Sequence, residues 1–235
     1  MMPMISPDHK IAYFPVPKAA CTSLKLAMYA LTNGHDYDKA ANGGKAIQQS
    51  FRTQNFVGSD LAGLDGFFKI AVVRDPVSRI ISAYTNKIEK WGQRMGKRMS
   101  DPKIVQAVAA DHILPEPPSL IEFCLRLGHY RRHFKSIRHH TNSFATFLGP
   151  DLGYFNRVYR MEELDVLCAD LLAQTGTVFA LPHANPSAPV DRTMNAAATA
   201  ALLAYCAPDY AYLAEYYTAP APADASSQRS PVAAL

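Results

Sequence analysis

Two short apolar segments, each followed by a polar loop and then by a helical pattern, constrain the fold of this chain more than any other feature. Residues 11–16 are followed by the loop 17–23, and residues 67–73 by a loop that starts at Arg74. Strands that alternate with helices favour a mostly parallel sheet flanked by helices. In such sheets ligands bind beyond the carboxyl ends of the strands, where both loops are expected to lie. We therefore predict an α/β protein with its ligand site at these loops.

Apolar periodicity gives the extent of the two helices that follow. Apolar residues at i, i+3, i+4 and i+7 mark the first helix from Leu24 onward, and the Asn33-Gly34 pair ends it. The second helix begins near Pro76, since proline is tolerated in the first turn, and its apolar stripe reaches about Trp91. Each loop thus leads directly into the amino terminus of a helix.

The later part of the chain is expected to add one more strand and further helices. Residues 155–160 have the pattern of a strand, and a helix is predicted over about 161–174. Residues 192–217 are predicted to form one or two helices broken near Pro208. The basic segment 92–138, which prolines interrupt, is predicted to be a helical substrate lobe.

Length and composition fit a chain with one sizeable core. The chain has 235 residues, of which 49% are hydrophobic. We predict a single domain over residues 1–217. Ala, Pro and Ser dominate residues 218–235, which are predicted to form a flexible tail. The sequence does not indicate the oligomeric state.

Composition and charge exclude several classes of protein. No apolar run approaches the roughly 18 residues of a membrane span, and the amino terminus lacks the pattern of a secretory signal, so a cytoplasmic location is expected. Four widely spaced cysteines form no C-x-x-C pair, which predicts neither a zinc site nor a disulfide framework. A formal charge of +4 is too small to indicate a nucleic-acid partner.

The loop after the first strand has the chemistry of an anion site. A helix amino terminus presents unpaired backbone N–H groups and the positive end of the helix dipole to an anion. Lys18 adds a cation, and Thr22 and Ser23 add hydroxyl donors. The nucleoside-triphosphatase pattern G-x-x-x-x-G-K-[ST] is absent. A capped turn without a ligand is the alternative interpretation of this loop taken alone.

The loop after the second strand offers a second anion site. Arg74 follows the strand, Ser82 lies eight residues later in the helix, and Arg79 shares the face of Ser82. An arginine fork and a nearby hydroxyl can bind a phosphate group. Alternatively, Asp75 and Arg79 form a local ion pair and Ser82 is a packed small residue.

These two segments resemble the donor-binding motifs of carbohydrate sulfotransferases, which use 3′-phosphoadenosine-5′-phosphosulfate (PAPS). Residues 17–25, Pro-Lys-Ala-Ala-Cys-Thr-Ser-Leu-Lys, resemble the 5′-phosphosulfate loop of that family, and residues 73–84 resemble its 3′-phosphate motif. The likeness is greatest to the chondroitin 4-O-sulfotransferase-like branch. A weaker likeness runs through residues 157–164 and 204–216.

The resemblance implies a P-loop-like sheet, PAPS as co-substrate and its desulfated form PAP as product. The residues form no metal-site pattern, so no metal ion is expected. It implies that Lys18 and the first loop hold the 5′-phosphosulfate, that Arg74 and Ser82 hold the 3′-phosphate, and that Arg79 braces the loop. The implied donor-site residues are Pro17, Lys18, Ala19, Ala20, Cys21, Thr22, Ser23, Arg74, Arg79 and Ser82.

The chain departs from the Golgi enzymes of that family. Those enzymes carry an amino-terminal membrane anchor and disulfide cysteines, and neither pattern appears here. The chain therefore resembles a soluble bacterial-type member. The acceptor is expected to be a carbohydrate or another hydroxylated metabolite, and the substrate of the eukaryotic enzymes is not carried over.

Sulfuryl transfer needs an in-line nucleophile and a stabilised leaving oxygen. Lys18 is the predicted partner of the leaving phosphate oxygen. Histidine is the usual base for activating an acceptor hydroxyl. His140 is the first candidate and His139 the second, because they lie between the second motif and the later strand as a histidine-containing stretch does in the family. The alternatives are His35, Asp111, Glu116 and Glu122.

Further alternatives stay open. A basic cluster in the middle segment would attract an acidic glycan or is simply a solvated face; its members are Arg126, Arg131, Arg132, Lys135 and Arg138. A small-molecule kinase would also use a strand-loop-helix phosphate site, but it needs magnesium ligands and a fuller glycine-rich loop. The third possibility is a nucleotide-binding protein whose catalytic function has lapsed.

Overall fold

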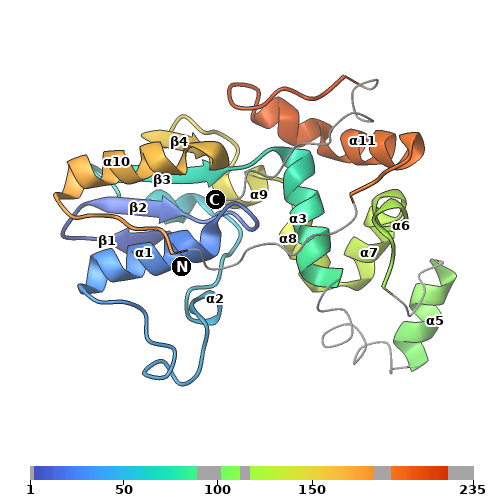
Figure 1. The fold of residues 1–235 in the computed structure, drawn as a ribbon, viewed down its shortest axis with the longest axis horizontal. Helices are drawn as coiled ribbons and strands as arrows, with labels where there is room; N and C mark the ends of the chain where they lie inside the picture. Colours follow the sequence, from blue (N-terminus) through green and yellow to red (C-terminus); the bar gives the residue numbers. More distant parts are fainter. Residues whose placement is uncertain (1–2, 89–101, 112–116, 183–191, 222–235) are drawn as a thin grey trace. The chain divides into compact units, whose positions relative to one another are not determined.

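The computed structural model describes residues 3–88, 102–111, 117–182 and 192–221. The chain divides into two compact units, and Figure 1 shows strands in one and helices in both. Unit 1 comprises Met1–Asp75 and Asn142–Pro186, and unit 2 comprises Pro76–Thr141 and Ser187–Leu235.

Unit 1 is built on a four-stranded sheet with the strand order β1-β2-β3-β4 (Figure 1). The strands are β1 (Met4–Ser6), β2 (Ile11–Phe14), β3 (Phe68–Val73) and β4 (Arg157–Arg160). β2, β3 and β4 run parallel, with Phe14 opposite Ala71 and Val73 opposite Arg160, whereas β1 pairs antiparallel with β2. The predicted mostly parallel sheet is confirmed in the described part of the chain. Because β2 and β3 are parallel neighbours, the loops that follow them leave the sheet at the same edge.

The burial of β2 explains why this segment forms a strand inside a layered fold. All four of its side chains are fully buried, which requires cover on both faces of the strand. α1 (Cys21–Asn33) contacts β1, and α10 (Leu164–Thr175) contacts β4. The other elements of unit 1 are α2 (Ile47–Ser50), η1 (Gly58–Leu61), α9 (Ala145–Leu148) and η2 (Met161–Glu163).

α1 carries the predicted apolar stripe and ends where the sequence predicts. The stripe that begins at Leu24 is buried. Gly34 follows the last turn with φ 72° and donates its N–H to the carbonyl oxygen of Ala30 at 2.9 Å. This left-handed conformation is easy for glycine, which explains why the Asn33-Gly34 pair stops the helix.

Unit 2 is helical in its described residues. Its helices are α3 (Pro76–Ile88), α5 (Pro102–Ala110), α6 (Leu120–Leu125), α7 (Leu127–His133), α8 (Lys135–Thr141) and α11 (Ala196–Tyr212). They share one apolar core, in which the rings of Tyr84, Phe123, Tyr130 and Phe134 contact one another in sequence. α3 contacts α8 and α11, and α11 contacts α6. The described part of segment 92–138 is therefore helical, as predicted.

The predicted break near Pro208 is wrong, because α11 continues through this proline. A proline in a helix interior removes a backbone hydrogen bond and costs about 3 kcal/mol or more. The same helix buries Leu202, Cys206 and Tyr210 in the core of unit 2, and this packing offsets the cost. Tertiary packing thus overrides the local signal.

The other expected elements agree with the structure apart from their ends. The strand predicted over 155–160 begins two residues later, and a short 3-10 turn, η2, precedes α10. β1 was not predicted, because a strand of three residues at a sheet edge has too short a pattern to recognise. Trp91 and most of the predicted tail, residues 222–235, lie outside the described residues.

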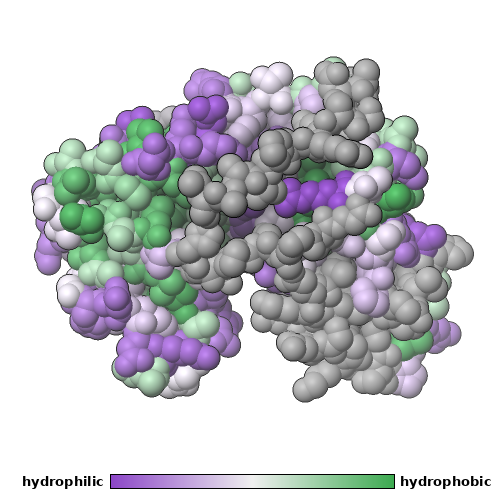
Figure 2. Space-filling view, in the orientation of Figure 1, coloured by the Kyte–Doolittle hydropathy of each residue, from purple (hydrophilic) through white to green (hydrophobic). Residues whose placement is uncertain are grey.

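The surface of unit 1 carries apolar residues beside its helices. Figure 2 shows green, hydrophobic surface on the side where α1 and α10 lie, interrupted by hydrophilic residues. Val166 and Leu172 of α10 and the nearby Val178 contribute to the exposed apolar residues. Among the helices of the described segments, none has the length and apolar character needed to cross a membrane.

Candidate functional site

The loop between β2 and α1 has an unusual backbone. Lys18 and Ala20 have φ values of 70° and 52°, in the left-handed region that side chains with a Cβ rarely adopt. The N–H of Ala19 reaches the carbonyl oxygen of Val16 at 3.4 Å, and the N–H of Leu24 donates to Ala20 at 3.1 Å as the helix begins. Strain of this kind is typical of loops that present backbone groups to a ligand.

The amino terminus of α1 is open to an anion. Ala20 is the N-cap, and its methyl side chain cannot accept a hydrogen bond from the first turn. The first turn holds no acidic residue, so no carboxylate of that turn offsets the positive end of the helix dipole. The N–H groups of Cys21, Thr22 and Ser23 have no acceptor within the helix, since they precede the first complete turn.

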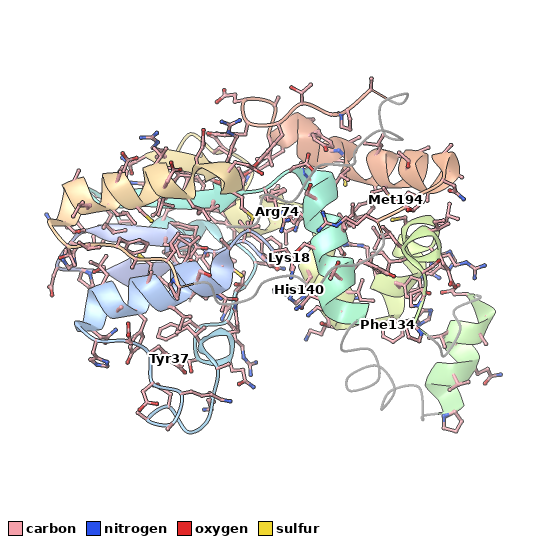
Figure 3. All side chains as sticks on the ribbon, viewed as in Figure 1. Lys18, Tyr37, Arg74, Phe134, His140 and Met194 are labelled. Atoms are coloured by element: carbon pink, nitrogen blue, oxygen red, sulfur yellow. The ribbon has the colours of Figure 1, made fainter. Side chains whose placement is uncertain are left out.

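The parallel sheet brings the start of the second predicted motif, Arg74, to this loop. Arg74, which directly follows β3, donates from Nη1 to the carbonyl oxygen of Lys18 at 3.3 Å. Figure 3 shows the two labelled residues beside each other, although 56 residues separate them in the sequence. The guanidinium of Arg74 therefore contacts the backbone of the loop that leads into the first turn of α1 in unit 1.

A buried lysine lies behind the loop. The side chain of Lys25 is fully buried and donates to the carbonyl oxygen of Phe51 at 2.6 Å, to Oγ1 of Thr53 at 2.8 Å and to Oε1 of Gln48 at 3.1 Å. Gln48 in turn donates from Nε2 to Oγ1 of Thr22. Burial lowers the pKa of Lys25 below its usual value, while its interaction with Cys21 acts in the opposite direction.

Sequence reasoning missed the roles of Lys25 and Gln48. Lys25 stands in the motif and precedes Met28 of the buried stripe by three residues, so its place on the same helix face carried a signal of burial. The sequence around Gln48 carried no such signal, because the contact of Gln48 with Thr22 depends on how the chain folds back onto α1 at α2.

A pocket of about 600 Å³ in unit 1 lies beside α1 but is not lined by Lys18 or Arg74. Its walls include Lys25 and Tyr29 of α1 together with Phe51 and Arg52. The positive groups of the first loop are therefore not gathered in this pocket.

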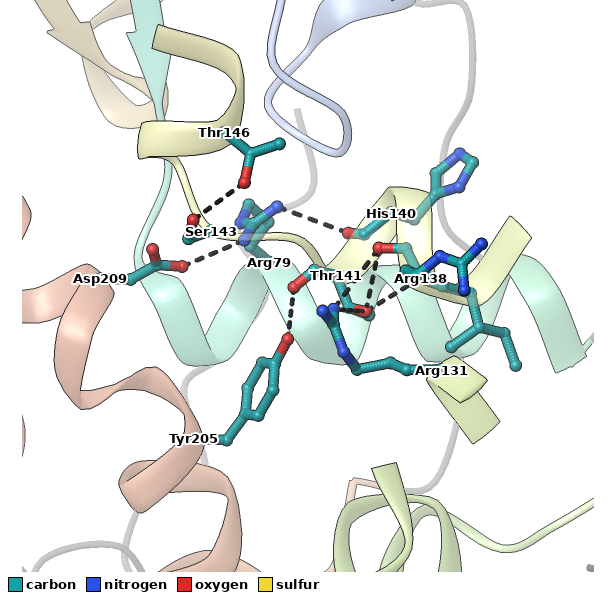
Figure 4. A network of polar contacts seen from close by, with 10 residues as sticks. Arg79, Arg131, Arg138, His140, Thr141, Ser143, Thr146, Tyr205 and Asp209 are labelled. Carbon is teal, nitrogen blue, oxygen red and sulfur yellow. Dashed lines mark hydrogen bonds and ion pairs between the residues drawn. The ribbon is translucent and has the colours of Figure 1, made fainter. Parts of the chain in front are cut away.

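The second predicted arginine, Arg79 of α3, is part of the interior of unit 2. Its side chain is fully buried and donates to Oδ2 of Asp209 at 3.1 Å and to the carbonyl oxygen of His140 at 3.4 Å (Figure 4). Burial lowers the pKa of Arg79, and the carboxylate of Asp209 opposes this shift. The predicted alternative partner, Asp75, belongs to unit 1. Ser82, also on α3, is buried with 7% exposure.

The two candidate bases lie on α8 of unit 2. The Nδ1 atom of His140 is 2.8 Å from the carbonyl oxygen of Ser136, and the rings of His139 and His140 contact each other edge to face at 5.1 Å. A carbonyl oxygen can only accept, so Nδ1 of His140 carries the proton and Nε2 carries the lone pair of the neutral ring. His140 thus has the tautomer that a general base acting through Nε2 requires.

Asp111 and His35, two of the alternative candidates for the general base, have surroundings that differ from those of His140. Asp111 contacts His129 at 3.1 Å, Arg132 at 2.7 Å and His133 at 2.6 Å, and these contacts hold the pKa of Asp111 below its usual value, with the hydrogen bond from His133 as the largest cause. The exposed His35 has its Nδ1 3.0 Å from the carbonyl oxygen of Asp36, as expected of a turn histidine.

Glu122 lies in the first turn of α6, and Glu116 is outside the described residues. The backbone N–H of Glu122 donates to Oγ of Ser119, a contact that does not favour Glu122 over His140 as the base.

The basic cluster divides into engaged and exposed members. Arg131 donates to Oγ1 of Thr141 at 2.8 Å and lies over the ring of Tyr205, and Arg132 pairs with Asp111. Lys135 and Arg138 are exposed. Only part of the cluster therefore has the character of a surface for an anionic ligand.

The predicted site residues thus separate into two groups. Unit 1 brings together Lys18, Arg74 and the first turn of α1, whereas Arg79, Ser82, His139 and His140 belong to unit 2. Within the part of the chain that the structure describes, no cluster of three or more His, Cys, Asp or Glu side chains has the arrangement of a metal site.

Comparison with known proteins gives two matches. Residues 2–205 match a family model described as the sulfotransferase family. Carbohydrate sulfotransferase 14 of Danio rerio is 29% identical over 102 residues, which cover 40% of this chain and 26% of that protein. The chain therefore matches about a quarter of the length of this relative. No solved structure matches the chain.

Proposed function

The chain belongs to the sulfotransferase family, and we propose that it moves a sulfuryl group from PAPS to a hydroxyl group of a carbohydrate without the help of a metal ion. The observation that carries the proposal is the contact between Arg74 and the backbone of Lys18, because it places a guanidinium group at the loop that leads into an open helix amino terminus. PAPS carries two anionic groups, the 5′-phosphosulfate and the 3′-phosphate, and needs positive charge and N–H donors to bind them.

In the proposed complex the first loop acts as a P-loop-like cradle for the 5′-phosphosulfate. The backbone of residues 17–23 provides N–H donors at the start of α1, and Lys18, Thr22 and Ser23 provide a cation and two hydroxyl groups. Arg74 and Ser82 bind the 3′-phosphate, which distinguishes PAPS from simpler adenine nucleotides. Arg79 acts as a brace, which agrees with its buried pairing with Asp209.

Charge stabilisation at the donor is the proposed source of catalysis. As the bond between sulfur and the bridging oxygen breaks, negative charge grows on the leaving phosphate. The ammonium of Lys18 and the N–H groups of α1 would neutralise that charge from fixed positions. These groups supply positive charge at the same place where a metal ion acts in phosphoryl transfer, which is why the proposed reaction needs none.

His140 is the proposed general base. Its Nδ1 proton is directed to the carbonyl oxygen of Ser136, which leaves the lone pair on Nε2 to accept the proton of the acceptor hydroxyl. The hydroxyl oxygen then attacks sulfur in line with the leaving phosphate oxygen. His139 is the second candidate for the same step.

A carbohydrate acceptor is proposed from the name of the relative and from the exposed charges of unit 2. The Danio rerio protein is named a carbohydrate sulfotransferase, and the exposed Lys135 and Arg138 would attract an acidic glycan. We further propose that residues 1–217 act as one sulfotransferase domain, with segment 92–138 in contact with the acceptor and residues 218–235 as a tail.

The direct test is transfer of labelled sulfate from PAPS to a panel of neutral and acidic glycans. Label is expected on a glycan with the wild-type protein, and loss of at least about a hundredfold in rate is expected for His140→Ala, in the range that general bases contribute. His139→Ala is the matched control and should lose much less. An undiminished rate in His140→Ala, or equal losses of rate in the two variants, would remove the assignment of His140 as the base. A wild-type protein that transfers label to no hydroxylated acceptor would contradict the proposed function.

A further inference from the structure

The buried ammonium group of Lys25 has a complete set of hydrogen-bond acceptors. It has three N–H donors, and its three partners are the carbonyl oxygen of Phe51, Oγ1 of Thr53 and Oε1 of Gln48. Three acceptors around one nitrogen favour the ammonium form against the effect of burial. The Lys25 ammonium is therefore the donor in all three hydrogen bonds.

This donor fixes the direction of the amide of Gln48. A lysine ammonium cannot accept a hydrogen bond, so the oxygen of the amide must face Lys25 and the nitrogen must face away from it. On that other side, Nε2 of Gln48 donates to Oγ1 of Thr22 and lies 3.7 Å from the sulfur of Cys21. The contact between Gln48 and Thr22 therefore runs in one direction only.

The direction decides what the Thr22 hydroxyl can do. Its oxygen accepts from Gln48, so its single proton does not go to that partner. If the amide were reversed, Oε1 would face Thr22 and would take the hydroxyl proton for itself. The charge of Lys25 excludes the reversed arrangement, because Nε2 and the ammonium would then meet donor to donor.

We propose that Lys25 and Gln48 are positioning residues that keep the Thr22 hydroxyl as a hydrogen-bond donor toward the 5′-phosphosulfate of the bound nucleotide. The inference rests on the proposed function, in which Thr22 contacts that group at the start of α1. Neither Lys25 nor Gln48 needs to touch the nucleotide. Their effect reaches it through the orientation of one hydroxyl group.

The competing explanation is that Lys25 merely fastens residues 48–53 to α1. In that case the hydrogen-bond acceptors of Lys25 would contribute to the stability of the fold but would not affect the direction of the hydrogen bond between Gln48 and Thr22. A substitution that keeps the contact with Lys25 and removes the donor toward Thr22 separates the two explanations, and Gln48→Glu has this property. Its carboxylate still accepts from Lys25, but it can only accept from Thr22.

Calorimetric titration with PAP, together with thermal unfolding, tests the proposal. Gln48→Glu is expected to unfold at the wild-type temperature or above it, because the partner of the Lys25 ammonium changes from a neutral amide to a carboxylate and the contact becomes an ion pair. Its affinity for PAP is expected to fall at least about tenfold, the loss expected of one hydrogen bond to a charged group. Thr22→Ala should lose a similar factor.

Two controls make the result specific. Gln49→Glu adds the same charge one residue away and keeps the acceptor for the N–H of Ala46, so it should bind PAP nearly as the wild type does. In the double variant Thr22→Ala/Gln48→Glu, the losses should not multiply, because both single changes remove the same donor.

The outcomes separate this inference from the proposed function. Wild-type affinity in Gln48→Glu, equal losses in Gln48→Glu and Gln49→Glu, or fully multiplicative losses in the double variant would each overturn the positioning role while the wild-type protein still binds PAP. A wild-type protein that fails to bind PAP would overturn the proposed function and the role of Thr22 with it.

Discussion

At the scale of single residues, Arg74 donates to the backbone carbonyl oxygen of Lys18, but the two side chains are proposed to act on different parts of the nucleotide. Lys18 would lie by the bridging oxygen, where negative charge grows during transfer. Arg74 would bind the 3′-phosphate, whose charge does not change in the reaction. An interaction that strengthens only in the transition state lowers the barrier, whereas one that is equal in both states contributes to binding alone.

Substitution of Lys18 should therefore reduce turnover more than PAP affinity, and substitution of Arg74 should reduce PAP affinity more than turnover. Lys18→Ala is expected to reduce turnover at saturating PAPS by about a hundredfold or more, with a smaller loss of PAP affinity. Arg74→Ala is expected to lose mainly PAP affinity. Steady-state kinetics and calorimetry on both variants measure the two quantities. Near-normal turnover in Lys18→Ala would show that this lysine only binds.

Arg79 is a residue whose removal should affect stability. Arg79→Met leaves Asp209 as a buried charge without its partner, which costs about 3–5 kcal/mol in comparable cases. Replacing both, as in Arg79→Met/Asp209→Leu, should recover much of that loss, since no buried charge remains. Urea denaturation measures the free energy of unfolding. If the double variant were no more stable than the single one, the ion pair would not be the reason for the burial of Arg79.

The residues of the site were predictable to different degrees. Arg74 directly follows β3, and Lys18 and Thr22 lie in the loop and the first helical turn after β2, so their position at the edge of a parallel sheet could be predicted from local pattern. Asp209 pairs with Arg79 across 130 residues and Gln48 meets Thr22 across 26, and no local pattern reports such contacts. Long-range pairing depends on the packed fold, which is why the sequence did not reveal it.

At the scale of elements, the strands and helices with strong periodicity were predictable and the exceptions have physical causes. β2 and β3 read as apolar runs because both are buried, and α1 ends at a glycine with the conformation that glycine favours. α11 passes through Pro208 because packing in unit 2 outweighs the lost hydrogen bond. Local propensity determines where a helix ends when the helix has few tertiary contacts, and tertiary packing overrides that propensity when it has many.

The ion-pair cluster around Asp111 links the end of α5 to α7 and should give unit 2 a dependence on pH. The contacts with His129, Arg132 and His133 lower the pKa of Asp111 in the folded state. A lowered carboxyl pKa contributes stability above the unfolded value of about 3.9, and this contribution is lost as the pH falls through the lower, folded value.

The variant Asp111→Asn should therefore unfold at a lower temperature than the wild type near neutral pH. The difference is expected to shrink as the pH falls below about 3.9, because the wild-type carboxyl then becomes neutral too. Thermal unfolding of both proteins over a pH series measures it. A difference that stays constant down to the lowest pH at which both proteins fold would contradict the role given to the charge.

At the scale of the whole molecule, the family match and the structure give complementary information. The match extends over residues 2–205 and so includes residues of both compact units. The open end of α1 and the contact of Arg74 with the preceding loop supply the local chemistry in unit 1. In unit 2, His140 contacts Ser136 within α8, and Tyr205 of α11 donates to the carbonyl oxygen of the neighbouring Thr141.

Transfer should be independent of divalent metal ions if protein groups supply the positive charge at the donor. The rate with labelled PAPS is expected to be the same with and without a strong chelator, because Lys18, Arg74 and backbone N–H groups remain in place. Loss of activity on chelation that added magnesium restores would instead favour the kinase-like chemistry described for phosphoryl transfer.

The most direct test of the central claim is a calorimetric comparison of PAP with AMP and ATP. PAP and AMP share the adenosine and the 5′-phosphate and differ in the 3′-phosphate, so their affinities isolate the role proposed for Arg74 and Ser82. PAP is expected to bind roughly 10- to 100-fold more tightly than AMP, the range expected for charge-assisted contacts to one phosphate, and more tightly than ATP. Equal affinity for PAP and AMP would contradict the claim that this protein is built to use PAPS.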